Sequence, residues 1–324
     1  MLYLRKSIFG STADKARVRI SHVRRSGACA DRARSSIACA IRPSAQFDRV
    51  RNSISIVRVI HMTTINKSIA YMTTTNKGVG QISIPKLLCL IFIPTLIVTT
   101  VYVIAGFSGF MQNTIPSLLL FFLCAALILF PIEIGIILSA SKKEYGSYSL
   151  KSAFARHNPM SWWKVLIYGS LLFAFAGIMS VTLAPLENKL FAPLSNQLAQ
   201  ITPSYFDWTN IEHLKQYPQG IILLTCIGYF VFNVIVGPIT EELFFRGYLT
   251  SKISRFGNFA PLIITVLFSL YHLWLPFNNL FRIAAFFPAA WFAWKYKNIY
   301  IAMVLHCLCN LLTSVSFIMA VYQG

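Results

Sequence analysis

Charged residues are scarce in this chain. Asp and Glu together number only 10 among 324 residues, and all charged residues make up 12% of the sequence, about half the share that is typical of a soluble globular domain. Hydrophobic residues make up 56%, and the mean hydropathy is +0.61. This balance excludes an ordinary soluble domain. It predicts a polytopic membrane protein, with a length that fits one helical membrane domain plus an extension.

Several signatures of other protein classes are missing. The 7 cysteines are odd in number and lack the spacing of a zinc knuckle. Five of them fall in apolar runs, so we interpret them as free thiols packed between helices rather than as a disulfide framework. The sequence has no His-Glu-x-x-His motif of a zinc metalloprotease, and its N-terminal region lacks the apolar core of a secretory signal.

The basic excess is concentrated near the N-terminus. Residues 1–86 hold 16 Lys and Arg against 3 Asp and Glu, whereas residues 87–324 hold 13 against 7. We therefore divide the chain into a basic extension of residues 1–84, predicted to be disordered or non-native, and a membrane domain of residues 85–324. The extension is a basic arm at anionic lipid headgroups, an organelle transit peptide, or a segment outside the mature protein, with translation starting at Met62 or Met72. Aromatic residues are scarce there, which argues against a nucleic-acid partner.

Hydropathy predicts an all-α, polytopic bundle of about seven transmembrane helices, because a helical span needs about 20 apolar residues. The sixth segment is short and is interrupted by Pro288, so we expect it to be tilted or partly re-entrant. The long stretch 184–220 contains four prolines and is predicted to be an exposed connection. The candidate spans are 85–105, 115–139, 162–183, 220–241 and beyond, 259–275, 280–294 and 299–322.

Lys and Arg residues cluster before the first predicted span and in every second connection after it. The positive-inside rule places such connections in the cytoplasm. We therefore expect a cytoplasmic N-terminus and an external C-terminus, with Arg282, near the outer end of the sixth span, as the exception. The expected location is a multi-pass position in the bacterial inner membrane, preferred over an organelle membrane.

Two adjacent carboxylates and a guanidinium lie inside a long apolar run, in the stretch 239–247. Each charge at membrane depth costs roughly 2.5–3.5 kcal/mol on insertion scales, so these groups need partners or a function. Glu242 and Arg246 are four residues apart, share one helix face and can neutralise each other. Glu241 lies about 100° around the helix and is left unpaired, which makes it the candidate general base. A further acid, Glu133, follows a proline in the second span, and we interpret it as structural.

Two histidines, His272 and His306, also fall in apolar runs. Asn310 follows His306 by one helical turn, so both side chains point into the same space. If the chain turns near Gly257, Glu242 and His272 lie level in an antiparallel hairpin. The match for His306 is looser, and a tilted or shortened sixth span would have to close that gap.

Three motifs on successive late spans resemble those of the CPBP family, which comprises the CAAX prenyl proteases and the bacteriocin-processing or immunity (Abi) proteins. The resemblance extends over residues 85–324, and it implies an α-helical intramembrane endopeptidase. In chain order, the motifs are Glu241-Glu242-x-x-x-Arg246, Phe268-x-x-x-His272 and His306-x-x-x-Asn310.

The resemblance also implies roles for these residues. Glu241 is the general base that activates water, and His272 assists it. His306 and Asn310 polarise the scissile carbonyl or hold its oxyanion. The remaining motif residues are supports, namely Glu242, Arg246 and Phe268.

Two questions stay open at this point. Glu241, His272 and His306 could bind zinc, although a glutamate-dependent mechanism needs no ion, and we favour the absence of a cofactor. The alternative function is a non-proteolytic transporter or bacteriocin-immunity protein that uses the same polar cluster as a proton relay or ligand site. Asn310 favours the protease, because a relay needs no oxyanion donor. The expected partners are a membrane-associated peptide or protein substrate and the lipid bilayer.

Overall fold

The computed structural model describes residues 80–323, and within that range it consists of helices and connections without a strand. The predicted all-α membrane bundle is confirmed. The three interpretations of the N-terminal extension concern residues that lie outside this range, apart from its last five positions.

The first part of the bundle begins with a capped helix. The Ser83 hydroxyl accepts a hydrogen bond from the Lys86 N–H (3.4 Å), and a proline occupies the first turn, both of which favour a helix start. Gly146 ends the last helix of this part with a left-handed φ of 78°. The elements are α2 (Ile84–Gly106), α3 (Gly109–Thr114), α4 (Ser117–Cys124), the π-helix η1 (Ala125–Leu129) and α5 (Phe130–Tyr145).

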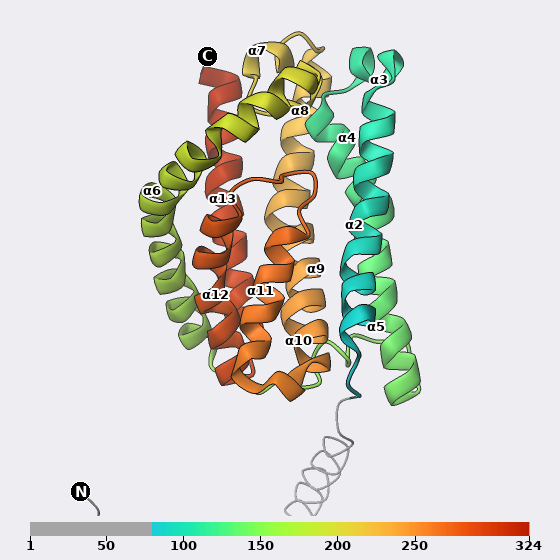
Figure 1. The fold of residues 1–324 in the computed structure, drawn as a ribbon, viewed down its shortest axis with the longest axis vertical. Coiled ribbons are helices and arrows are strands. Elements are labelled where there is room, and N and C mark those ends of the chain that lie inside the picture. The colour runs from blue at the N-terminus through green and yellow to red at the C-terminus, as the bar shows by residue number, and fades with distance from the viewer. Residues whose placement is uncertain (1–79, 324) are drawn as a thin grey trace, which may run out of the picture. The chain divides into compact units, whose positions relative to one another are not determined.

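The second part contains the motif residues. Its long helices run alongside α2 and α5 (Figure 1). The elements are α6 (Trp162–Ile201), η2 (Ser204–Phe206), α7 (Ile211–Leu214), α8 (Gln219–Gly228), η3 (Tyr229–Val236), α9 (Gly237–Glu241), η4 (Glu242–Leu249), α10 (Thr250–Lys252), η5 (Ser254–Phe259), α11 (Ala260–Leu270), α12 (Asn279–Tyr296) and α13 (Tyr300–Gln323).

The predicted count of seven spans is not confirmed. Among the described residues, five helical stretches are long and apolar enough to cross a membrane. The predicted fifth and sixth spans correspond to α11, of only 11 residues, and to α12. These two helices form a hairpin whose connection lies part-way along the bundle (Figure 1). The five candidates are Ile84–Gly106, Ser117–Tyr145, Trp162–Ile201, Gln219–Lys252 and Tyr300–Gln323.

The hairpin explains why the charge pattern alternated so regularly along the sequence. Helices α11 and α12 add two segments to the predicted number of spans. Because the pair turns back inside the bundle, the chain returns after α12 to the same end of the bundle at which α11 began. The ends of α5, α10 and α12 and the start of α6 therefore lie at the same end of the bundle (Figure 1). The expected cytoplasmic N-terminus stays a prediction.

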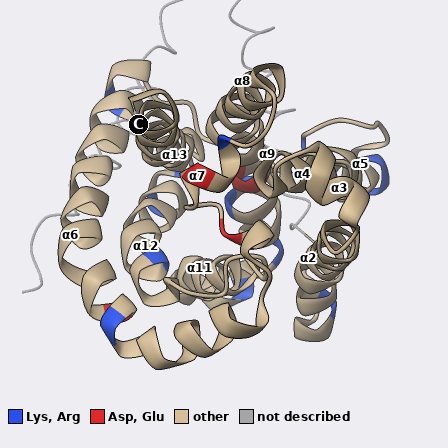
Figure 2. Ribbon diagram, turned by 90° about the horizontal axis from the view of Figure 1, so that it is seen from above, with Lys and Arg blue, Asp and Glu red and all other residues tan. Residues whose placement is uncertain are grey.

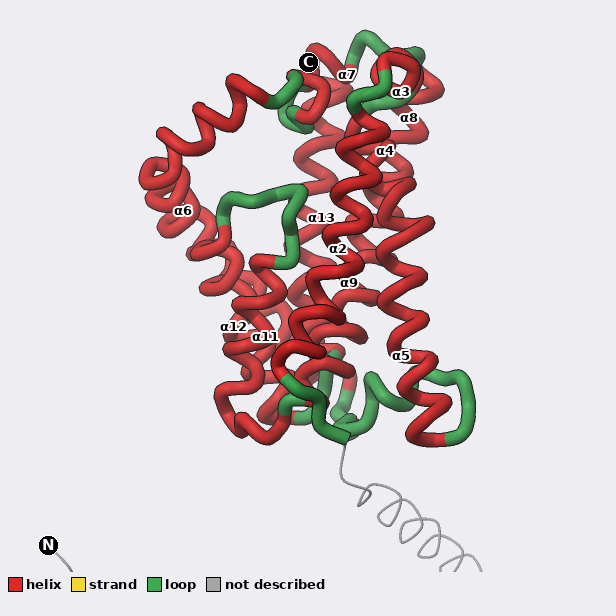
Figure 3. Tube along the Cα trace, turned by 45° about the vertical axis from the view of Figure 1, so that its right-hand side comes forward, coloured by secondary structure: helices red, strands yellow, loops and turns green. Residues whose placement is uncertain are grey.

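Helix α6 corrects the predicted connection at 184–220. It continues for 40 residues, with Pro185 and Pro193 inside it, and it bows away from the other helices (Figure 3). Prolines remove backbone hydrogen bonds and bend a helix. Its buried Glu187 accepts hydrogen bonds from the first amides of α12, at 2.9 Å from the Leu280 N–H and 2.7 Å from the Phe281 N–H. The carboxylate thus satisfies helix-start donors that have no partner within the helix.

Large aromatic side chains fasten the α11–α12 hairpin to η4. Phe245 and Phe268 are each at most 1% exposed, and their rings meet edge to face with centroids 5.1 Å apart. Tyr271, also fully buried, contacts Phe245 at 5.0 Å. Each such side chain removes a large apolar area from its surroundings and packs with a defined geometry. This contact sets the position of the second motif against the first.

Candidate active site

Two π-helices, η3 and η4, lie on either side of α9, and η4 contains Glu242 and Arg246 of the first motif. In a π-helix each amide bonds to the carbonyl five residues before it, and such turns occur often at functional sites. The Gly237 N–H donates to the Phe232 carbonyl in this register. A Cβ atom at Gly237 would lie 2.8 Å from that oxygen, so the close turn requires glycine. The next amide position belongs to Pro238, which has no N–H, and the carbonyl of Asn233 is left without its helical donor.

The third motif supplies the missing donor. The Asn310 side-chain amide donates to the Asn233 carbonyl at 2.8 Å. In return, the Asn233 amide donates to the Ser314 hydroxyl at 3.0 Å. These bonds fix η3 against α13. Sequence reasoning missed Asn233 because it searched the apolar runs for ionisable groups; an Asn five residues before a proline in such a run was the available signal.

The predicted ion pair between Glu242 and Arg246 is present. A carboxylate oxygen of Glu242 lies 3.1 Å from the Arg246 guanidinium, and both side chains are at most 1% exposed. The same Glu242 oxygen lies 3.0 Å from Nδ1 of His306. An ionised carboxylate accepts hydrogen bonds but cannot donate them. Nδ1 of His306 is therefore the donor in this contact and carries a proton.

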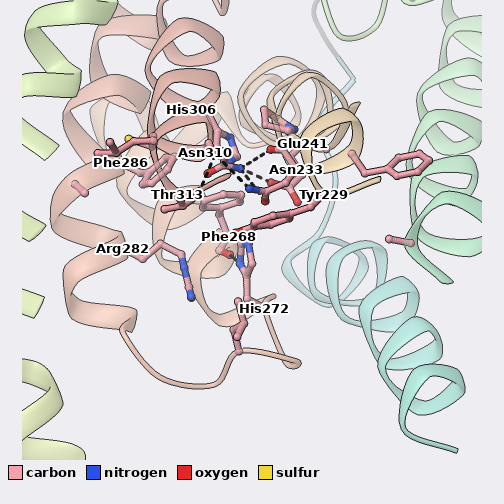
Figure 4. A pocket seen from close by; sticks show the side chains of 18 of the residues that line it. Tyr229, Asn233, Glu241, Phe268, His272, Arg282, Phe286, His306, Asn310 and Thr313 are labelled. Atoms are coloured by element: carbon pink, nitrogen blue, oxygen red, sulfur yellow. Dashed lines mark hydrogen bonds and ion pairs between the residues drawn. The ribbon is translucent and has the colours of Figure 1, made fainter. Parts of the chain in front are cut away.

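Glu241 is less isolated than its spacing predicted. The other ring nitrogen of His306, Nε2, lies 3.7 Å from a carboxylate oxygen of Glu241. That distance is within an ion pair but beyond a hydrogen bond. With His306 protonated, Glu241, Glu242, His306 and Arg246 carry two negative and two positive charges, so the buried chain is neutral. Figure 4 shows His306, Glu241, Asn233 and Asn310 gathered in one place.

His272 lies just beyond the end of α11, in the connection to α12, rather than inside a span. Its Nδ1 is 2.8 Å from the Phe268 carbonyl. A carbonyl accepts and cannot donate, so Nδ1 carries the proton and Nε2 is left with a lone pair. No hydrogen bond or ion pair joins His272 to Glu241 or His306 in the described structure.

Phe268 connects the three motifs. Its ring meets the His272 ring edge to face with centroids 4.9 Å apart, and the His306 ring at 5.8 Å. The Arg246 guanidinium lies over the Phe268 ring at 4.0 Å, a cation–π contact that is strong when desolvated. Phe268 therefore contacts two imidazoles and a guanidinium at once, and its supporting role stays a prediction.

A cavity of about 370 Å³ is lined by the motif residues Glu241, Phe268, His272, His306 and Asn310. The rest of its lining is mainly apolar and comes in part from α4, η1, α5 and α6. An apolar cavity with a few convergent polar groups is the usual form of a ligand site. Figure 4 shows the labelled side chains around it.

One charged residue at the cavity, Arg282, lies elsewhere than the sequence predicted. Arg282, expected near the outer end of a span, lies inside the bundle and lines the cavity. Its guanidinium donates to the Ser269 carbonyl at 2.9 Å. Glu133, which the sequence analysis interpreted as structural, is fully buried. No local pattern could have shown that Arg282 lines the cavity, because the other lining residues come from helices that are distant in the sequence.

The residues as placed do not form a metal site. Within residues 80–323, no group of three or more His, Cys, Asp or Glu side chains is arranged to hold a metal ion. The alternative zinc set of Glu241, His272 and His306 is therefore not assembled as one group. We derive no step through a metal.

The comparison with protein families agrees with the motifs. Residues 213–312 match the family described as type II CAAX prenyl endopeptidase Rce1-like. The resemblance to the CAAX prenyl proteases is confirmed. All seven motif residues lie inside the matched segment. Searches of curated proteins and of solved structures found no match to the chain. The Rce1-like segment and the apolar helices support a CAAX-type intramembrane endopeptidase, a hydrolase within an integral membrane protein.

Proposed function

We propose that this protein hydrolyses a peptide bond of a membrane-associated peptide or protein, with Glu241 as the base that activates water. The observation that carries the proposal is the chain Glu241–His306–Glu242–Arg246 at the wall of the cavity. The Arg246 guanidinium, and the His306 imidazole when it is protonated, favour the ionised form of Glu241, which is the form that a general base needs.

The two histidines are suited to different tasks. Nε2 of His272 has a lone pair and lines the cavity, so it assists by accepting a hydrogen bond from the attacking water. His306 is held at Nδ1 by Glu242 and, when protonated, presents an N–H at Nε2. As Glu241 takes the proton of the water, this N–H becomes available to the oxygen of the scissile carbonyl.

Asn310 supplies a second donor for the oxyanion. Its side-chain nitrogen carries two hydrogens, and one of them is directed to the Asn233 carbonyl. The other makes a longer bond, of 3.4 Å, to the side-chain oxygen of Asn233, and the substrate oxygen would replace that weaker partner. Fixed donors of this kind stabilise the developing negative charge because they need no reorganisation during the reaction.

The position of Arg282 favours a substrate that carries a negatively charged group near the scissile bond. Its guanidinium lines the cavity and bonds to carbonyl and amide oxygens, but it makes no ion pair with a carboxylate of residues 80–323. A carboxylate at the end of a peptide chain would satisfy this charge.

The test is cleavage of a membrane-tethered peptide by the purified protein in vesicles. Glu241→Gln keeps the shape of the side chain and removes the base, so we expect a loss of roughly 100-fold or more in kcat. His272→Ala and Asn310→Ala should also reduce kcat. The matched control is Glu212→Gln, since Glu212 is 85% exposed. Full activity in all three site variants would disprove the catalytic assignment, whereas a lack of cleavage by the unmodified chain would favour a proton relay or ligand site.

A further inference from the structure

A second, smaller cleft lies on the other side of Arg246 from the cavity. It has a volume of about 20 Å³ and is formed by the 153–157 segment, η4, α10 and the end of α12. Arg156, His157 and Lys297 line it, together with Arg246. None of the described residues that line it is acidic. We call this site the basic cleft, and Arg246 is its only member that belongs to the motifs.

The basic cleft contains buried side-chain nitrogens without hydrogen-bond partners among the described residues. Nη1 of Arg156 and Nδ1 of His157 are buried, and neither finds a hydrogen-bond partner within residues 80–323. The same holds for Nε and Nη2 of Arg246, whose side chain is 1% exposed. Burying donors without acceptors costs roughly 1–3 kcal/mol each. The cluster therefore fits an acceptor supplied from outside the chain.

Aromatic side chains place the basic cleft at the depth of lipid headgroups. The Arg156 guanidinium lies 3.5 Å from the centre of the Trp294 ring. Nearby, Trp162 packs on Tyr300 at 5.1 Å, and His157 contacts the same Tyr300 at 5.4 Å. Tryptophan and tyrosine gather at the membrane–water interface. The cleft also lies at the end of the bundle where the Lys and Arg residues of the connections gather.

We propose that the basic cleft binds a phosphate group, that of an anionic lipid headgroup in the adjacent leaflet. The volume has room for about one water-sized atom group, so one phosphate oxygen enters and the rest of the headgroup stays in the interface. Basic pockets between transmembrane helices bind anionic headgroups in this way. Burial lowers the pKa of His157, so near pH 7 its imidazole is a neutral hydrogen-bonding group and the charge comes from the guanidinium and ammonium groups.

The site adjoins the catalytic machinery without belonging to it. Arg246 lines the basic cleft, while its guanidinium pairs with Glu242 on the other side. The inference stands apart from the proposed function, because it concerns binding of a lipid and can be measured without cleavage.

The experiment measures binding of fluorescent phosphatidylglycerol to the full chain in phosphatidylcholine vesicles. The test variant combines Arg156→Gln with Lys297→Gly. Lys297 has a left-handed φ of 54°, which glycine adopts without strain, so Lys297→Gly alone keeps the test valid if the double variant does not fold. The control combines Lys143→Gln with Lys295→Gln, which removes the same charge from exposed positions at the same end.

We expect the test variant to bind phosphatidylglycerol roughly 25-fold more weakly than the unmodified chain, at about fivefold for each of the two cations removed. The control should change binding by a smaller factor. Equal losses in both variants would overturn the proposal, since they indicate diffuse attraction to a basic surface. In a second arm, sodium phosphate is added as a competitor of the lipid, and sodium chloride at the same ionic strength is the control. Displacement at millimolar phosphate would show that the cleft takes free phosphate and would overturn the lipid assignment.

Discussion

The side-chain amide of Asn310 donates a 2.8 Å hydrogen bond to the backbone carbonyl of Asn233. The carbonyl is free because Pro238, five residues later, has no N–H to offer in the π-helical register. A residue proposed to stabilise the oxyanion therefore also satisfies the backbone of a neighbouring helix. Substituting it removes both contributions, and a loss of activity alone does not identify which one matters.

Pro238→Ala separates the two contributions of Asn310. Asn310→Ala leaves the Asn233 carbonyl without a donor, and we expect a loss of roughly 1–3 kcal/mol in the free energy of unfolding. Pro238→Ala restores an N–H that can donate to that carbonyl. The double variant should therefore regain much of the stability but none of the cleavage activity. Thermal unfolding and peptide cleavage, measured on the four proteins of the cycle, provide the check. Recovery of activity together with stability would mean that Asn310 acts through the fold alone.

The sequence predicted which residues form the candidate site, because charged side chains are rare within apolar segments. The spacing of Glu242 and Arg246 predicted their ion pair, and the structure contains it at 3.1 Å. In a π-helix, residues four positions apart still lie close enough for long side chains such as Glu242 and Arg246 to contact each other. The link from His306 to Glu242 was not readable, because it joins η4 to α13 across 64 positions.

The hairpin of α11 and α12 shows where hydropathy stops being informative. An apolar segment that ends part-way through a bundle has the same composition as one that crosses it. Arg282 was accordingly assigned to the outer end of a span, whereas the hairpin brings it to the cavity. Backbone re-entry of this kind is stable because protein covers it.

Glu242 is predicted to matter for stability as well as activity. Glu242→Gln leaves Arg246 buried without its counter-charge and weakens the hold on His306. Breaking a buried ion pair from one side costs roughly 3–5 kcal/mol. Adding Arg246→Met removes the uncompensated charge, so the double variant should recover stability while cleavage stays low. Unfolding of the two variants in a denaturant series measures this. If Glu242→Gln is as stable as the unmodified chain, the ion pair does not support the fold.

Gly247 is predicted to be required by a close approach of two chain segments. A Cβ atom there would lie 2.6 Å from the backbone oxygen of Ala153, and a backbone atom cannot move aside as a flexible side chain does. We expect Gly247→Ala to destabilise the protein by roughly 1–3 kcal/mol. The control is Gly135→Ala, also in a helix, where nothing lies within 4 Å of the added atom. That variant should be neutral or more stable by up to about 1 kcal/mol. Equal melting temperatures for the two variants would contradict the prediction.

Glu187 is predicted to keep α6 against the cavity. Its carboxylate is 3% exposed and accepts from the Leu280 and Phe281 amides at 2.9 and 2.7 Å. Hydrogen bonds to a charged group contribute roughly 1.5–3 kcal/mol, and the helix start of α12 favours a negative charge. Glu187→Ala should therefore release the outer half of α6 and raise KM more than it lowers kcat, because α6 forms part of the cavity wall. Glu187→Gln keeps an acceptor and should lie between the two. Hydrogen exchange along α6 gives a second measure, with Glu212→Ala as the exposed control. Unchanged exchange and an unchanged KM in Glu187→Ala would show that apolar packing alone holds α6 in place.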